Sequence, residues 1–212
     1  MLEKIARRNF IKLGAVGLGF LGLAATSCGD ESEANDTETL LIDVSCDQNT
    51  IRFEGPQGVN PNNPADVGPH PYYGASFVVQ GVIYPSGTLS NGNENAGLLA
   101  DGTPEFPNEV IGNWICRGWF IGDSNDPARG GIFTPTGPFV ATSQIYNLDQ
   151  DNPGSETLTS EGIELIDLNT PFNRAITGGT GTRNGASGTV TQTGIGANQT
   201  GLFNFTFEFN FV

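Results

Sequence analysis

The feature that most constrains the fold is a period-two alternation of apolar and polar residues from residue 40 to the end of the chain. It is clearest at 202–212, where phenylalanines occupy alternate positions and polar residues lie between them. Successive side chains of a β-strand point to opposite faces, so this spacing predicts strands with one buried face. No stretch after residue 40 shows the 3.6-residue period of a helix. The sequence therefore predicts an all-β domain.

Eight alternating segments are separated by connections rich in glycine, proline and asparagine. The predicted strands span residues 40–46, 73–84, 109–121, 139–148, 157–167, 172–177, 186–193 and 202–212. Such a pattern is typical of an antiparallel barrel or sandwich. Glycine makes up 30 of 212 residues, about twice the usual ~7%, which suits tight turns and sharply bent strands. We predict an eight-stranded antiparallel up-and-down β-barrel over residues 40–212, with an interior that is filled by side chains or holds one small ligand.

Two connections are longer than ordinary hairpin loops. One spans residues 47–72 and contains five prolines, and the other spans residues 122–138. Alternate connections of an up-and-down barrel lie at the same mouth, so both belong to one mouth. They form either a lid over the interior or a pair of surface excursions.

Residues 1–27 have the layout of an export signal, with a charged start, a glycine-rich apolar run at 13–25 and small residues before Cys28. The segment 7–12, Arg-Arg-Asn-Phe-Ile-Lys, resembles a twin-arginine signal. The residues before Cys28 resemble a lipoprotein processing box, which predicts a lipid on Cys28. As a membrane anchor the apolar run is too short, because a helix needs ~20 residues to span a bilayer.

The resemblance to a twin-arginine signal implies that the following domain folds before it is exported. Residues 28–39 are acidic and have little to bury, so we expect a flexible tether. The predicted location is the periplasmic side of a membrane or the cell surface, with anchoring through Cys28.

The charge balance excludes some partners. The chain has 9 basic and 23 acidic residues and a net charge of −14. A nucleic-acid partner is excluded, because such binding rests on cationic neutralisation of phosphates. Contact with anionic lipid is disfavoured for the same reason, so the lipid anchor is the expected link to the membrane.

Cysteine and histidine limit the chemistry further. With Cys28 lipidated, Cys46 and Cys116 remain, and they form either a disulfide or two buried thiols. The chain has no Cys-x-x-Cys motif, and His70 is its single histidine. We therefore predict no metal site and no Ser-His-Asp triad.

A family resemblance lies in the second half of the chain. Its motifs are Gly-Ser-Glu-Thr-Leu-Thr-Ser-Glu-Gly at 154–162, Arg-Ala-Ile-Thr-Gly-Gly-Thr-Gly at 174–181, Ala-Ser-Gly at 186–188 and the phenylalanine-rich 201–209. This series resembles the allene oxide cyclase and dirigent barrel superfamily, while residues 40–138 match only in strand character. The resemblance implies an eight-stranded barrel with an apolar cavity, often a homotrimer. It also implies cyclisation of an epoxide or steering of phenoxy-radical coupling, with no bound cofactor.

Glu164 is the candidate acid–base residue. The resemblance points to it, because in dirigent proteins an acid two residues after the glycine of this strand faces the cavity. Glu164 also shares a strand face with Leu158 and Ser160, so it is expected to point into the interior. Burial there would favour the neutral carboxyl, which suits a general acid. Arg174 on the next strand is the second candidate, and pairing with it would instead keep Glu164 ionised.

Three further residues are candidate ligand contacts. Arg117 shares a face with Ile115 and Trp119 and would bind a substrate carboxylate through two hydrogen bonds. Gln144 and Tyr146 share a strand face and would place hydrogen-bonding groups in the cavity. The alternation shows which residues share a face but not which face is inside, so a solvent-facing position stays open for each.

The sequence is compatible with three functions. The first is the binding of a small hydrophobic molecule without turnover. The second is a cofactor-free cyclase or isomerase that uses Glu164 as acid and base. The third is a structural envelope protein, which requires an interior filled by side chains. The content of the barrel interior decides between them.

Overall fold

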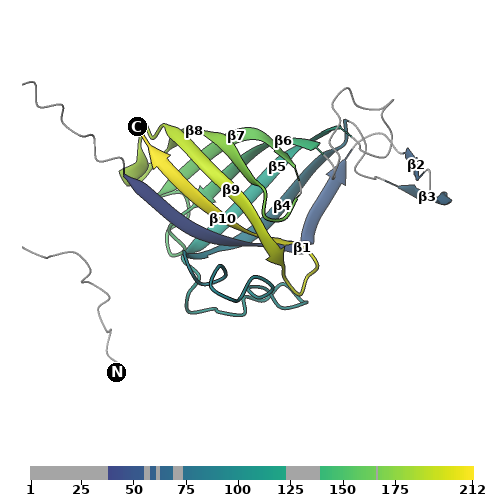
Figure 1. Cartoon of the computed structure of the whole chain (residues 1–212), viewed down its shortest axis with the longest axis horizontal. Coiled ribbons are helices and arrows are strands. Elements are labelled where there is room, and N and C mark those ends of the chain that lie inside the picture. Colours follow the sequence, from purple (N-terminus) through teal and green to yellow (C-terminus); the bar gives the residue numbers. More distant parts are fainter. Residues whose placement is uncertain (1–37, 55–57, 61–62, 69–73, 123–138, 166) are drawn as a thin grey trace, which may run out of the picture. The chain divides into compact units, whose positions relative to one another are not determined.

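The computed structural model describes residues 38–54, 58–60, 63–68, 74–122, 139–165 and 167–212 (Figure 1). The predicted signal, Cys28 and nearly all of the predicted tether lie outside the described residues. So do residues 69–73 and 123–138, on which the lid prediction depends. Within the described part of the chain, no helix is long and apolar enough to cross a membrane.

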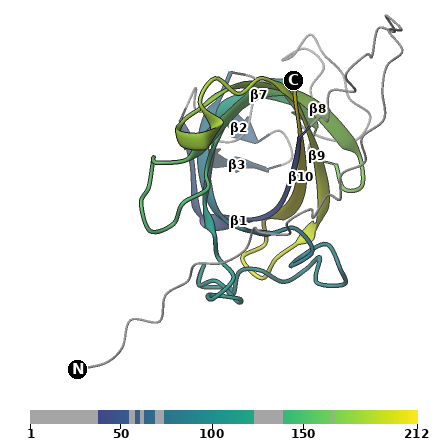
Figure 2. The same ribbon diagram turned by 90° about the vertical axis from the view of Figure 1, so that its left-hand side faces the viewer.

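Eight strands form a closed antiparallel barrel, which Figure 2 shows end-on. They are β1 (Thr39–Glu54), β4 (Ser76–Pro85), β5 (Gly112–Gly122), β6 (Phe139–Asn147), β7 (Thr157–Leu165), β8 (Pro171–Gly179), β9 (Gly188–Ala197) and β10 (Phe203–Phe211). Each strand pairs with the strands before and after it in the barrel, and β1 pairs with β10 to close the ring. The prediction of an eight-stranded up-and-down barrel is confirmed.

Alternate residues of each strand face the inside and the outside of the barrel. On β10 the phenylalanines face inward, and Phe207 and Phe209 are buried while Glu208 between them is exposed. On β1 they meet an equally apolar partner, because Ile42 lies opposite Phe207 and Leu40 lies opposite Phe209. Burial of these side chains is the main stabilising contribution to the fold.

Strand β1 is longer than predicted. The polar run after Cys46 interrupts the alternation, so the predicted strand ends there. In the structure β1 continues to Glu54, with an irregularity in its pairing to β4 between Asp47 and Arg52. The segment predicted as a loop also holds a short antiparallel hairpin of β2 (Gly58–Asn60) and β3 (Asn63–Gly68).

The connection between β4 and β5 packs against the outside of the barrel. The Asp43 carboxylate, on the outer side of β1, accepts hydrogen bonds of 2.8 to 3.2 Å from the backbone N–H groups of Gly87, Leu89 and Ser90. The Tyr84 hydroxyl donates to the carbonyl of Gly97 at 2.6 Å. Asp43 and Tyr84 are therefore buried although their strand positions face outward.

Candidate functional site

An apolar pocket of about 80 Å³ lies inside the barrel, near the mouth where β1, β5, β7 and β9 end. Its lining comprises Cys46, Ile51, Phe53, Phe77, Val79, Trp114, Cys116, Phe120, Val140, Glu164, Gln192, Leu202, Phe203 and Phe205. Among the described residues of this lining, Glu164 supplies the one carboxylate and Gln192 the one amide. An apolar pocket with a few polar groups is the usual form of a small-molecule site.

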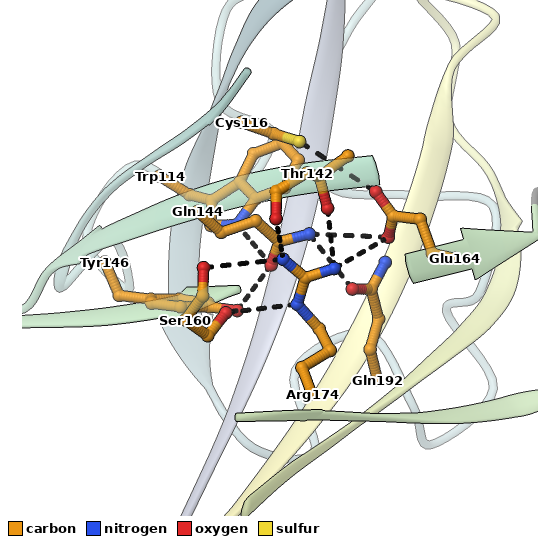
Figure 3. A network of polar contacts seen from close by, with 9 residues as sticks. All are labelled: Trp114, Cys116, Thr142, Gln144, Tyr146, Ser160, Glu164, Arg174 and Gln192. Atoms are coloured by element: carbon orange, nitrogen blue, oxygen red, sulfur yellow. Dashed lines mark hydrogen bonds and ion pairs between the residues drawn. The ribbon is translucent and has the colours of Figure 1, made fainter. Parts of the chain in front are cut away.

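Next to the pocket the interior is filled by a polar network, drawn in Figure 3. Its members come from five adjacent strands and are Trp114, Cys116, Thr142, Gln144, Tyr146, Ser160, Glu164, Arg174 and Gln192. All nine are buried, because each occupies an inward position of its strand. Beyond the network, the rings of Phe207 and Phe209 pack edge-on against Tyr146.

Arg174 is the cation of the network, and its side chain is completely buried. Its Nε donates to the Ser160 hydroxyl at 3.1 Å, and its Nη1 and Nη2 donate to the hydroxyl and the carbonyl of Thr142 at 2.6 and 3.1 Å. Nη1 also lies 3.6 Å from Oε2 of Glu164. Gly162 leaves room for the side chain, since a Cβ there would lie 3.1 Å from Cγ of Arg174. The buried charge is thus both hydrogen-bonded and paired, as burial of a charge requires.

Gln144 connects the two ends of the network. Its Oε1 accepts hydrogen bonds from the indole Nε1 of Trp114 at 3.3 Å and from the Tyr146 hydroxyl. Its Nε2 donates to Oε1 of Gln192 at 3.0 Å and to Oε2 of Glu164 at 3.4 Å. An indole N–H can only donate, so this contact fixes which end of the Gln144 amide is the oxygen.

Glu164 is buried but loosely held. Its polar side-chain contacts within the described part of the chain are Gln144 Nε2 at 3.4 Å, Arg174 Nη1 at 3.6 Å and Cys116 Sγ at 4.0 Å. A charge-assisted hydrogen bond normally measures 2.7–2.9 Å. The carboxylate therefore lies between the network and the pocket with capacity for a further hydrogen bond.

Burial holds the other acidic groups of the interior in their neutral forms. It raises the pKa of Tyr146, whose hydroxyl therefore stays protonated and donates to Gln144. Burial, and secondly the nearby Glu164, raise the pKa values of the Cys46 and Cys116 thiols well above their ordinary range. Neither thiol is a good nucleophile in this state.

The two cysteines are free thiols. Cys46 lies opposite Gly81 and Cys116 lies opposite Val79, so β4 separates them. Two strand spacings amount to roughly 9.5 Å, beyond the ~7 Å between Cα atoms that a disulfide bridges. The sequence left open a disulfide or two buried thiols for this pair, and the structure shows two buried thiols.

The structure brings four of the five predicted catalytic or ligand-binding residues into one network: Gln144, Tyr146, Glu164 and Arg174. Arg117 is exposed on the outer face of β5 beside Trp119, so its side chain does not reach the pocket. Sequence reasoning missed Gln192. The sequence offered one signal for it. Gln192 lies two residues after Val190 on β9, so the two side chains share a strand face, and Val190 is buried.

The sequence matches no known family and no curated protein. Similar solved structures include a pyocyanin demethylase, at 16% identity and a TM-score of 0.48 over 82% of this chain and 100% of the other. They also include two pterocarpan synthase dirigent proteins. One is 12% identical with a TM-score of 0.49 over 82% of both chains. The other is 14% identical with a TM-score of 0.48 over 84% of this chain and 97% of that one. These similarities concern the barrel architecture alone.

Proposed function

We propose that the protein binds a small apolar molecule, or the apolar end of a larger one, in the pocket beside Glu164. The observation that carries this proposal is the division of the interior. One part is filled by the network and by core side chains, whereas the adjoining part is a pocket of about 80 Å³ with an almost wholly apolar wall. A purely structural barrel has no need of such a pocket.

The size of the pocket limits what enters it. A dry apolar cavity of ~150 Å³ holds a benzene molecule, so about 80 Å³ accepts a short alkyl chain or one side of a ring. The aromatic side chains of Phe53, Phe77 and Phe203 are partly buried and line the same pocket. Small rotations of these side chains would let them pack around a whole ring.

Binding can be tested with toluene as the probe, followed by shifts of backbone amide signals in the NMR spectrum of the full chain. We expect shifts at Cys116 and Val140 on the pocket wall. Leu202→Trp, which fills the pocket from its rim, should abolish them. The matched control is Leu41→Trp, because Leu41 is exposed on the barrel surface. Equal toluene binding by both variants would contradict the proposed site.

A second candidate function is cofactor-free isomerisation or cyclisation with Glu164 as acid and base. The observation that favours it is the loosely held carboxylate in the pocket wall, with Arg174 at 3.6 Å to stabilise its ionised form. In this scheme Glu164 takes a proton from one atom of the ligand and returns it to another. General acid–base catalysis of this kind contributes a rate factor of about 10² to 10⁴.

Hydrogen–deuterium exchange separates an enzyme from a binding protein. Cyclohexanone in D₂O would exchange its α-protons faster in the presence of the protein if Glu164 acts as a base. Glu164→Gln should remove this acceleration. Glu161→Gln, on the exposed side of the same strand, should keep it. No acceleration by the unaltered protein would favour binding without turnover.

We further propose export through the twin-arginine route and anchoring through a lipid on Cys28. The support is the residue pattern of the first 28 positions. The double variant Arg7→Lys, Arg8→Lys should leave precursor in the cytoplasm, and Cys28→Ser should remove the lipid. Unchanged envelope fractionation of both variants would refute the proposal.

Assembly as a homotrimer is also proposed. Trp119, Ala141 and Ile163 lie opposite one another across the outer faces of β5, β6 and β7, and Trp119 and Ile163 are about half exposed. Contiguous apolar residues on a surface are typical of interaction sites. Trp119→Glu should convert the assembly to monomers in light scattering, and a monomeric unaltered protein would exclude it.

A further inference from the structure

We infer that the ligand of this pocket carries a hydrogen-bond donor and an acceptor on one edge, as a lactam or another cis amide does. This rests on the proposed binding function and goes beyond it by naming the ligand's polar group. It follows from the direction of the hydrogen bonds in the network, which leaves one donor and one acceptor at the pocket wall.

The free donor is Nε2 of Gln192. Trp114 donates to Oε1 of Gln144, so the other end of the Gln144 amide must be the NH₂ group. That group donates to Gln192 at 3.0 Å, and the accepting atom on Gln192 is therefore its oxygen. The NH₂ group of Gln192 is then left without a hydrogen bond among the described residues. Gln192 is only 2% exposed and lines the pocket, so its NH₂ group is an unpaired donor at the ligand site.

The free acceptor is Oε1 of Glu164. The other carboxylate oxygen, Oε2, faces Gln144 and Arg174, whereas Oε1 has the Cys116 thiol at 4.0 Å as its contact. A thiol is a weak donor. Glu164 is 7% exposed and lines the same pocket. Oε1 therefore has capacity for a stronger hydrogen bond than the one from the thiol.

The two groups together select the ligand. Glu164 lies on β7 and Gln192 on β9, with β8 between these strands. A ligand edge that carries both a donor and an acceptor can pair with both groups at once. The N–H of a lactam would donate to Glu164, and its C=O would accept from Gln192. A ligand carboxylate is disfavoured, because it would bring a second negative charge against Glu164.

Three ring compounds of similar size test this inference on the full chain. 2-Piperidinone offers both N–H and C=O, whereas N-methyl-2-piperidinone and cyclohexanone lack the N–H. Dissociation constants would be measured from NMR titrations of the Gln192 side-chain NH₂ signals and the backbone signals of the pocket. We expect 2-piperidinone to bind about tenfold more tightly than the other two compounds, as one added hydrogen bond to a charged group provides.

The variant Glu164→Leu should remove most of this preference, because the N–H then has no acceptor. Gln192→Leu should weaken the binding of all three compounds alike, because each carries the C=O that Gln192 would bind. Gln80→Leu should change none of the affinities, because Gln80 is exposed on the outer face of β4. Should either variant fail to fold, Glu164→Met or Gln192→Met serves in its place, and the three compounds on the unaltered protein remain decisive. Equal affinities for the three compounds would overturn the inference and leave the proposed binding function standing. Failure of all three compounds and of toluene to bind would overturn both.

Discussion

Nη1 of Arg174 lies 3.6 Å from Oε2 of Glu164, and this pair is enclosed in a barrel whose chain has a net charge of −14. Arg174 is the one buried cation among the described residues. It is held by Thr142 and Ser160 from the two preceding strands, so its charge is fixed beside the pocket. The pair thereby keeps a carboxylate inside a largely apolar lining.

Removing Arg174 should destabilise the barrel strongly. Arg174→Met leaves Glu164 unpaired and deprives Thr142 and Ser160 of their partner, and such losses cost about 3–5 kcal/mol. The free energy of unfolding in urea measures the effect. Arg117→Met, on the exposed outer face, is the control and should change stability by less than ~0.5 kcal/mol.

The double variant Arg174→Met, Glu164→Gln tests the coupling between the two residues. Because Glu164→Gln removes the charge that Arg174→Met leaves unpaired, the double variant should lose less stability than the sum of the single losses. Strict additivity would show that the two residues do not interact.

Phe207→Asp should prevent folding. Phe207 is 1% exposed and packs against Tyr146 and Trp114, so the new carboxylate would be buried without a partner. Circular dichroism should show loss of the β-spectrum. Thr206→Asp, one position away on the other face, should still fold. A folded Phe207→Asp protein with an unchanged melting temperature would contradict the inward placement of β10.

Gly179→Val should lower stability by more than the ~1 kcal/mol of a typical substitution. Gly179 ends β8 without a positive φ, and the turn that follows has one at Gly181 (62°). The reason at Gly179 is steric, because a Cβ would lie 2.4 Å from the Arg183 carbonyl oxygen and 2.8 Å from that of Thr157. Thermal unfolding would measure the loss, with Thr189→Val on the exposed side of β9 as control.

Stability should fall as the pH rises above about 8.5. Burial raises the pKa values of Cys46 and Cys116 and raises the pKa of Tyr84 to about 12. In the unfolded chain these groups ionise near 8.5 and 10. Above those values the unfolded chain binds fewer protons than the folded barrel, so the free energy of unfolding decreases with pH.

Urea titrations between pH 7 and pH 11 should show this decrease begin near 8.5 and steepen above 10. The double variant Cys46→Ala, Cys116→Ala should lose the decrease between 8.5 and 10 and show a shallower one above 10, where the buried tyrosines still contribute. A slope that is the same with and without the thiols would contradict their assignment as buried neutral groups.

Much of the fold could be predicted from the sequence, because each barrel strand alternates apolar and polar residues with a period of two. The alternation on β10 predicts both the strand and its buried face. The second half of β1 carries no such signal, since the run from Asp47 to Thr50 is polar throughout. There the pairing with β4 determines the structure, and pairing depends on residues distant in the sequence.

The candidate site was predictable residue by residue but not as a network. Face sharing relates Glu164 to Ser160 within one strand, and it relates Gln144 to Tyr146 in the same way. It does not show that Gln144 reaches Gln192, which is 48 positions away and three strands along the barrel. Such contacts cross the interior, where the period of a single strand gives no information.

The pairing of β1 with β10, which closes the barrel and forms its seam, limits when the barrel can fold during synthesis. Thr39 and Asn210 are paired across this seam although they are 171 positions apart. A chain emerging from the ribosome therefore cannot complete the barrel until β10 has been synthesised. Pairing over such a separation is slow, and until it occurs Arg174 and Glu164 remain open to water. Removal of Phe209 and Asn210 would thus leave Leu40 and Thr39 without their partners on β10.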